Sequence, residues 1–182
     1  MSEFQGSVVA LAGGVGGAKL ADGLAQLLGE RLAADRARDG DPQDAIDRDV
    51  ARSRARITGA PIVVLVCLTL EEADAYPDDT RSRAEFLMAV QSTAMATQNL
   101  LLAAHAEGLA ACWMCAPLFC PEVVRASLDV PPAWQPQGLV TLGVPADGGR
   151  DRPRKPLAAF VRYAATASDE VVGFTAGASS RL

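Results

Sequence analysis

A basic stretch near the end of the chain carries the clearest ligand-binding side chains. Residues 147–156 place Arg150, Arg152, Arg154 and Lys155 beside two glycines. Neighbouring guanidinium groups match the geometry of a phosphate group. A basic loop of this composition is also common on a solvent-exposed surface. The spacing alone therefore leaves both a phosphate site and a plain surface loop open.

A glycine-rich stretch near the start of the chain is a second candidate. Residues 7–28 read as an apolar run, four glycines and an amphipathic run, which predicts a strand, a turn and a helix. The glycines are Gly13, Gly14, Gly16 and Gly17. Their backbone amides could approach an anion at the start of the helix, with Lys19 adding charge. No Ser or Thr follows Lys19, so this is not a P-loop, and the spacing is not a clean dinucleotide fingerprint.

Three closely spaced thiols, Cys112, Cys115 and Cys120, form the third candidate. They could bind zinc, but the Cys-x-x-Cys pair is not repeated and the only histidine, His105, falls within a predicted helix. Free cysteines are common core residues, so we expect no metal. Together with Cys67, and without a secretory signal pattern, the free thiols predict a cytoplasmic protein.

The element that must position these groups is a long helix. Residues 82–107 contain neither Gly nor Pro and are rich in Ala, Leu and Met, which predicts a helix about 40 Å long. Asp78, Asp79 and Thr80 can cap its start, and Gly108 can end it in a left-handed conformation. Apolar residues surround most of the helix. We therefore expect it to be central and buried on nearly all sides, in part against a second copy of the chain.

The rest of the chain alternates between strand and helix patterns. The continuous apolar run at residues 60–70 predicts a strand in the middle of a sheet, with both faces covered. Residues 109–114 predict a short buried strand, followed by a loop at 115–120 and a helix at 121–128. A further strand, antiparallel or mixed, is predicted at 138–144. The pattern indicates an α/β (α+β) fold, a mixed sheet flanked by helices around the long one.

A dense mixture of arginines and aspartates fills residues 30–57. Gly40, Asp41 and Pro42 divide this stretch into two helices. A solvated helix face with ion pairs at four-residue spacing explains the pattern better than a phosphate site.

Composition excludes several classes of partner. The chain has 182 residues, 49% of them hydrophobic, which is enough for one domain with a small attachment. Its formal charge of −5 argues against nucleic acid and anionic membranes, and no apolar run is long enough for a membrane span. Small molecules are the partners that we expect.

Most of the chain resembles the FMN-binding nitroreductase family. The similarity covers about residues 31–163 and is clearest in QNLLLAAHAEGLAACWMCAPLFCPEVVRASLDVPPAWQPQGLVTLGVP, followed by RPRKPLAAFV. A GL-x-x-CW block, an FCPEVVRA-x-LD-x-P helix and a basic Arg-Lys-Pro-Leu element occur in the family's order. Within the family, the sequence is most similar to the C-terminal domain of coenzyme F420:L-glutamate ligase.

The resemblance implies an FMN-dependent oxidoreductase with a nitroreductase-like fold. The implied role is reduction of a dehydro-F420 precursor in coenzyme F420 biosynthesis, associated with F420 glutamate ligation. The implied assembly is a homodimer with FMN at the interface. By analogy the backbone of Met114, Cys115 and Ala116 faces the flavin N5 edge, and Arg152 and Arg154 bind the phosphate. No catalytic side chain is assigned.

The start of the chain departs from this family. Residues 7–28 resemble the opening of the 2-phospho-L-lactate (phosphoenolpyruvate) transferase of F420 biosynthesis. The family's amino-terminal Arg-x-Ser-x-Arg helix, which binds the flavin phosphate, is not found here. We therefore divide the chain into segment 1–30, a nitroreductase-like domain at 31–163 and a tail at 164–182. A transferase-like protein that uses the glycine loop, and a flavin-free nitroreductase-like module, are the alternatives.

Overall fold

The computed structural model describes the backbone of residues 7–11, 15–148 and 153–161, and within these ranges the side chains from Leu20 onward. The chain divides into two units, Met1–Asp147 and Gly148–Leu182. The second unit contains one short 3-10 helix, η2 (Leu157–Ala159), among its described residues. All other described elements belong to the first unit. Whether segment 1–30 has an origin of its own stays a prediction from the sequence.

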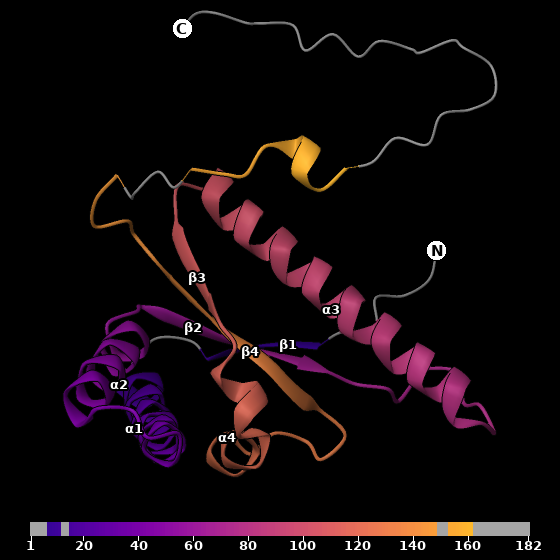
Figure 1. Ribbon diagram of the computed structural model, residues 1–182, viewed down its shortest axis with the longest axis horizontal. Coiled ribbons are helices and arrows are strands. Elements are labelled where there is room, and N and C mark those ends of the chain that lie inside the picture. Colours follow the sequence, from indigo (N-terminus) through magenta and orange to yellow (C-terminus); the bar gives the residue numbers. More distant parts are fainter. Residues whose placement is uncertain (1–6, 12–14, 149–152, 162–182) are drawn as a thin grey trace, which may run out of the picture. The chain divides into compact units, whose positions relative to one another are not determined.

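A four-stranded sheet forms the centre of the first unit (Figure 1). It consists of β1 (Ser7–Leu11), β2 (Ile62–Leu68), β3 (Ala110–Met114) and β4 (Gln135–Gly143), in the order β1-β2-β4-β3. Every pairing among these described strands is antiparallel. The predicted α/β (α+β) class is confirmed, with an antiparallel sheet where the sequence pattern indicated a mixed one.

The strand β2 is the core of this sheet, as its apolar run predicted. It lies between β1 and β4, and its residues from Val63 to Leu68 are all buried. Val63 and Leu65 belong to a core cluster with residues of helices α1 (Val15–Arg38) and α4 (Pro121–Leu128). Val64 belongs to a second cluster, which includes residues of α3 (Asp79–Ala106). Helices therefore cover both faces of β2.

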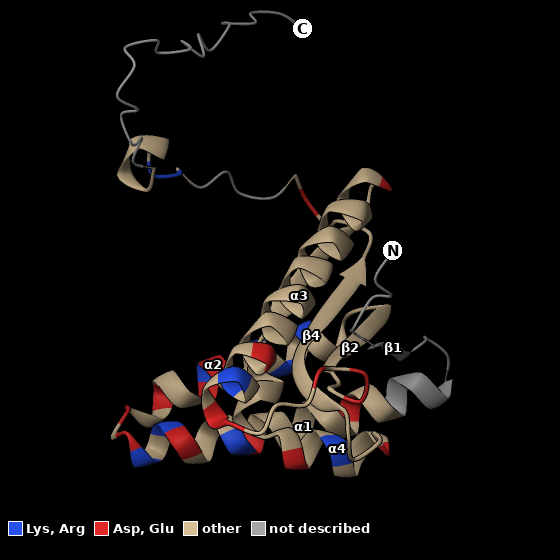
Figure 2. Ribbon diagram, turned by 90° about the vertical axis from the view of Figure 1, so that its right-hand side faces the viewer, with Lys and Arg blue, Asp and Glu red and all other residues tan. Residues whose placement is uncertain are grey.

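The helix α3 has the predicted ends but not the predicted burial. The Asp78 carboxylate accepts a hydrogen bond from the Arg81 amide at 3.0 Å, and Gly108 has a φ of 75° just after the helix. Its buried residues are confined to one stripe: Ala89, Thr93, Thr97 and Ala104. The expectation of burial on nearly all sides was wrong, because the small sheet covers one face of the helix only. The opposite face is exposed. In Figure 2 the middle of α3 is tan, because residues 86–106 include no Lys, Arg, Asp or Glu.

The strand β3 also differs from its prediction. Residues 109–114 were expected to be buried, but β3 lies at an edge of the sheet, with every side chain exposed or half-buried. A strand at the edge of a sheet has only one neighbouring strand. An apolar sequence is therefore not enough to predict that its side chains are buried.

The helices α1 and α2 (Gln43–Thr58) pack against each other and carry the charged stretch. Arg31 pairs with Asp35 at 2.8 Å, and an ion pair of the same spacing joins Asp44 to Arg48 on α2 at 2.7 Å. Arg36 links the two helices through Asp49. The predicted ion pairs at four-residue spacing are confirmed, and Figure 2 shows the alternating charges along both helices.

One glycine of β4 is required by the packing of β3. A Cβ atom at Gly138 would clash with the indole nitrogen of Trp113 and would lie 3.2 Å from the Met114 carbonyl oxygen. We expect Gly138→Ala to lower the free energy of unfolding by about 1–3 kcal/mol, because the indole and the strand must shift. The control Gly23→Ala, on an open face of α1, is expected to raise it by about 0.5–1 kcal/mol. Denaturant titrations of both variants test this, and equal stabilities would contradict the packing described.

Candidate functional site

The candidate site begins at the carboxyl end of β3, where Met114, Cys115 and Ala116 follow one another. Met114 and Ala116 are half-buried and Cys115 is exposed. Among the described strands β3 pairs with β4 alone, so its other edge is open. An open strand edge presents backbone N–H and C=O groups that can bind the polar edge of a planar ligand. Met114 ends this edge, and Cys115 and Ala116 continue the backbone beyond it.

A tight turn fixes the backbone immediately after these residues. The 3-10 helix η1 (Ala116–Phe119) starts at once, with the Leu118 amide donating to the Cys115 carbonyl at 3.0 Å. Pro117 within η1 is buried, and Pro121 opens α4. The sequence produces this turn because proline fixes φ at both positions and α4 can begin at Pro121 without losing a hydrogen bond.

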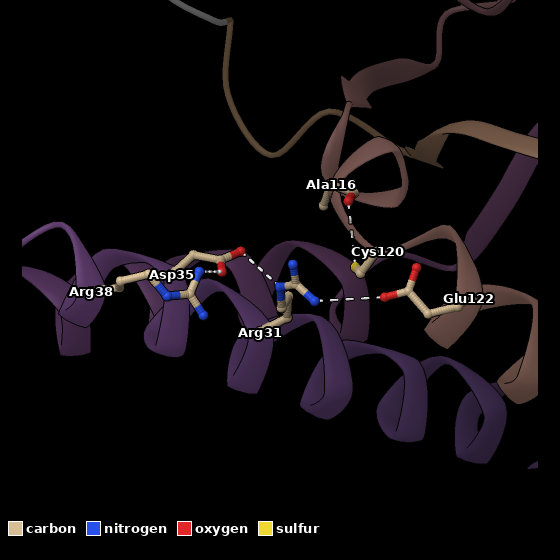
Figure 3. Close-up of polar contacts among 6 residues, drawn as sticks. All are labelled: Arg31, Asp35, Arg38, Ala116, Cys120 and Glu122. Atoms are coloured by element: carbon tan, nitrogen blue, oxygen red, sulfur yellow. Dashed lines mark hydrogen bonds and ion pairs between the residues drawn. The ribbon is translucent and has the colours of Figure 1, made fainter.

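A small pocket lies on the α1 side of this turn. It has a volume of about 220 Å³ and is lined by Ala116, Phe119 and Cys120 on one side and by residues of α1 on the other. In Figure 3, Arg31 of α1 reaches Asp35 at 2.8 Å and Glu122 at 3.6 Å, which connects α1 to the start of α4. Ligand pockets are usually about 300–1,000 Å³. This one is below that range, and we interpret it as a gap in the packing of the turn against α1 rather than as a ligand site.

The electrostatics of this pocket do not favour a reactive thiol. The Cys120 thiol is buried and donates to the Ala116 carbonyl oxygen at 3.6 Å, as drawn in Figure 3. Burial raises the pKa of Cys120, and the nearby Glu122 raises it further. The hydrogen bond from Arg31 lowers the pKa of Asp35, so that carboxylate stays ionised. A thiol with a raised pKa is a poor nucleophile at neutral pH, so Cys120 has a structural role.

A larger groove lies beside Leu118, on the turn that follows β3. It has a volume of about 550 Å³, within the usual range for ligands. Phe86, Leu87 and Val90 of α3 line it, together with Leu118. The remaining lining comes from α4, from the following loop and from the start of β4. Sequence reasoning missed this groove, because its walls come from segments far apart in the chain.

Of the predicted phosphate-binding residues, the structure describes only Arg154, which belongs to the second unit. Arg154 is exposed and forms no ion pair among the residues that the structure describes, so its guanidinium group is available to an anion. It belongs to the second unit, as does Lys155, whose ammonium group lies 6.0 Å from the Phe160 ring centre. Arg152 lies outside the described residues.

Several other predicted features can be located or set aside. Gly13 and Gly14 lie outside the described residues, and so does the side chain of Lys19. Within the described part of the chain, no three Cys, His, Asp or Glu side chains are grouped so that they could hold a metal ion. No helix of that part is long and apolar enough to cross a membrane.

Comparisons with known proteins agree with the fold. A model described as the nitroreductase family matches residues 15–144. Among solved structures, B. megaterium NfrA2 is 20% identical with a TM-score of 0.63, covering 92% of this chain and 60% of its own. The FMN-dependent nitroreductase NfnB from Mycobacterium smegmatis, in complex with NADPH, is 20% identical with a TM-score of 0.62, covering 88% and 79%.

A third structure is the NADPH:FMN oxidoreductase from Vibrio harveyi, complexed with NAD+. It is 18% identical to this chain with a TM-score of 0.60, covering 92% of this chain and 63% of its own. This chain spans about six-tenths of the length of the B. megaterium and V. harveyi proteins. Identities this low show a shared fold alone.

Proposed function

The chain belongs to the nitroreductase family, and from this premise we propose that it is an FMN-dependent oxidoreductase acting on a small molecule. The observation that carries the proposal is the open edge of β3, which ends at Met114 and continues into Cys115 and Ala116. These are the residues that the sequence resemblance assigns to the flavin. The names of two similar structures, one in complex with NADPH and one with NAD+, make a nicotinamide dinucleotide the first electron donor to test.

Two groups of residues, each in its own unit, have chemistry that suits part of FMN. The backbone after β3 offers donors and acceptors to the ring edge, and its conformation is fixed by the η1 turn. Arg154, exposed and without an ion pair in the described residues, offers a guanidinium group to the phosphate, with Arg152 beside it in sequence. Bound FMN supplies hydride transfer at N5, and the protein orients it. No acid or base side chain is assigned to the reaction.

We propose further that the substrate belongs to coenzyme F420 biosynthesis. The support is the sequence run at residues 98–145, which is most similar to the C-terminal domain of coenzyme F420:L-glutamate ligase. The reaction would be reduction of a dehydro-F420 precursor, associated with F420 glutamate ligation. A cytoplasmic homodimer is the setting that we propose, since all four cysteines are free and α3 exposes an apolar face.

Anaerobic turnover of the FMN-loaded protein tests the substrate. We expect the dehydro-F420 precursor to be reduced when both protein and reduced FMN are present, and not by reduced FMN alone. The absorbance of the precursor measures this directly. If FMN binds and a nicotinamide dinucleotide reduces it, but the precursor is not consumed, the F420 role is wrong and the oxidoreductase proposal stands.

A further inference from the structure

The groove beside Leu118 contains one charged side chain, Arg125 of α4. Arg125 is half-buried, and its Nη1 lies 3.5 Å from the Pro132 carbonyl oxygen, at the limit of a hydrogen bond. No carboxylate of the described residues forms an ion pair with it. A half-buried guanidinium group without a counter-charge keeps N–H donors that can bind an anion. Arg125 therefore has the properties of an anion-binding residue.

The rest of the groove is suited to an apolar body. Phe86 and Leu87 of α3 line one part of it, and Leu118 and two prolines, Pro132 and Pro136, line others. Phe86, Leu87 and Leu118 are between one-third and one-half exposed, so part of their apolar surface is uncovered. The side chains of Gln135 and Gln137 add amide groups.

We propose that this groove binds a small organic anion with a flat apolar body, and that Arg125 binds its carboxylate. Three observations lead to this class of ligand: the unpaired cation, the absence of any acidic residue from the lining, and a volume of about 550 Å³. Guanidinium and carboxylate groups form paired, charge-assisted hydrogen bonds. Flat apolar groups pack well against aromatic and proline side chains.

The position of the groove connects it to the proposed reaction. Leu118 lies in η1, which begins at Ala116, one of the residues proposed to face the flavin. A ligand in the groove would therefore lie beside the proposed cofactor edge, as a reactant must. The role of the groove as the site of the second reactant rests on the proposed function. The binding of the anion is independent of that function, because the described residues of the first unit supply the whole lining of the groove.

Calorimetric titration of the FMN-free protein with 2-naphthoate tests the site without depending on flavin binding. We expect 2-naphthoate to bind, and both the neutral analogue 2-naphthalenemethanol and inorganic phosphate to bind at least tenfold more weakly. Arg125→Gln should weaken 2-naphthoate binding about tenfold, and Arg125→Lys should weaken it less. The control Arg83→Gln removes an exposed arginine of α3 that has no ion pair in the described residues, and should bind like wild type.

Three results would overturn the proposal. One is equal 2-naphthoate affinity for wild type and a folded Arg125→Gln variant, judged by its circular dichroism. Another is equal weakening by Arg83→Gln, which would make the effect one of net charge alone. The third is a failure of 2-naphthoate to bind wild type. This result would also count if light scattering showed a dimer whose second copy fills the groove.

Discussion

Alanine in place of Arg154 is expected to weaken FMN binding by about tenfold or more. Arg154 is exposed and forms no ion pair in the described residues, so its guanidinium group is available to the FMN phosphate. A hydrogen bond to a charged group is worth about 1.5–3 kcal/mol, which corresponds to at least a tenfold change in affinity. Quenching of FMN fluorescence during titration measures the dissociation constants.

The control for this experiment should be an arginine without a structural role. Arg36 is unsuitable, because it pairs with Asp41 at 2.6 Å and also with Asp49, and so holds α1 to α2. Arg83 is exposed and has no ion pair in the described part of the chain, so Arg83→Ala is the better choice. Equal FMN affinities of wild type, Arg154→Ala and Arg83→Ala would show that Arg154 does not bind the phosphate.

A glutamate in place of Met95 is expected to convert the protein from a dimer into a monomer. Met88, Met95 and Leu102 recur every seven residues along α3 and are 58%, 62% and 57% exposed, so they form one apolar stripe. An isologous interface would bring this stripe against its copy near the two-fold axis. An unpaired charge buried there costs about 3–5 kcal/mol, or a hundredfold or more in the dissociation constant.

Light scattering at micromolar protein concentration measures the assembly state. Wild type and the apolar control Met95→Leu should both be dimers, whereas Met95→Glu should be monomeric with unchanged helix content. A wild-type protein that is monodisperse and monomeric under these conditions would refute the dimer. It would also leave the exposed stripe of α3 without an explanation.

The elements whose signals are local could be predicted from the sequence. The β-branched run of β2 predicts a buried strand whatever its neighbours are, and Asp78 and Gly108 mark the ends of α3 by local backbone chemistry. The ion pairs of α1 and α2 follow from four-residue spacing in the same way.

Features that depend on distant partners could not be predicted. The composition of α3 indicates that it must be covered, but not whether the same chain or another copy covers it. The strand β4 begins at Gln135 rather than 138, because β2 shifts register between Val66 and Cys67 and so accommodates Pro136. Arg125 appears in the sequence as an ordinary helix residue. Its significance depends on the groove around it, which the order of residues along the chain does not reveal.

The visible absorption spectrum of the purified protein tests the central claim most directly. The protein should be titrated with FMN and scanned at each addition, beside FMN alone at the same concentrations. We predict weak but saturable binding, seen as absorption bands shifted from those of free FMN. A colourless protein that shows no FMN binding even at millimolar FMN would contradict the account and favour a flavin-free nitroreductase-like module.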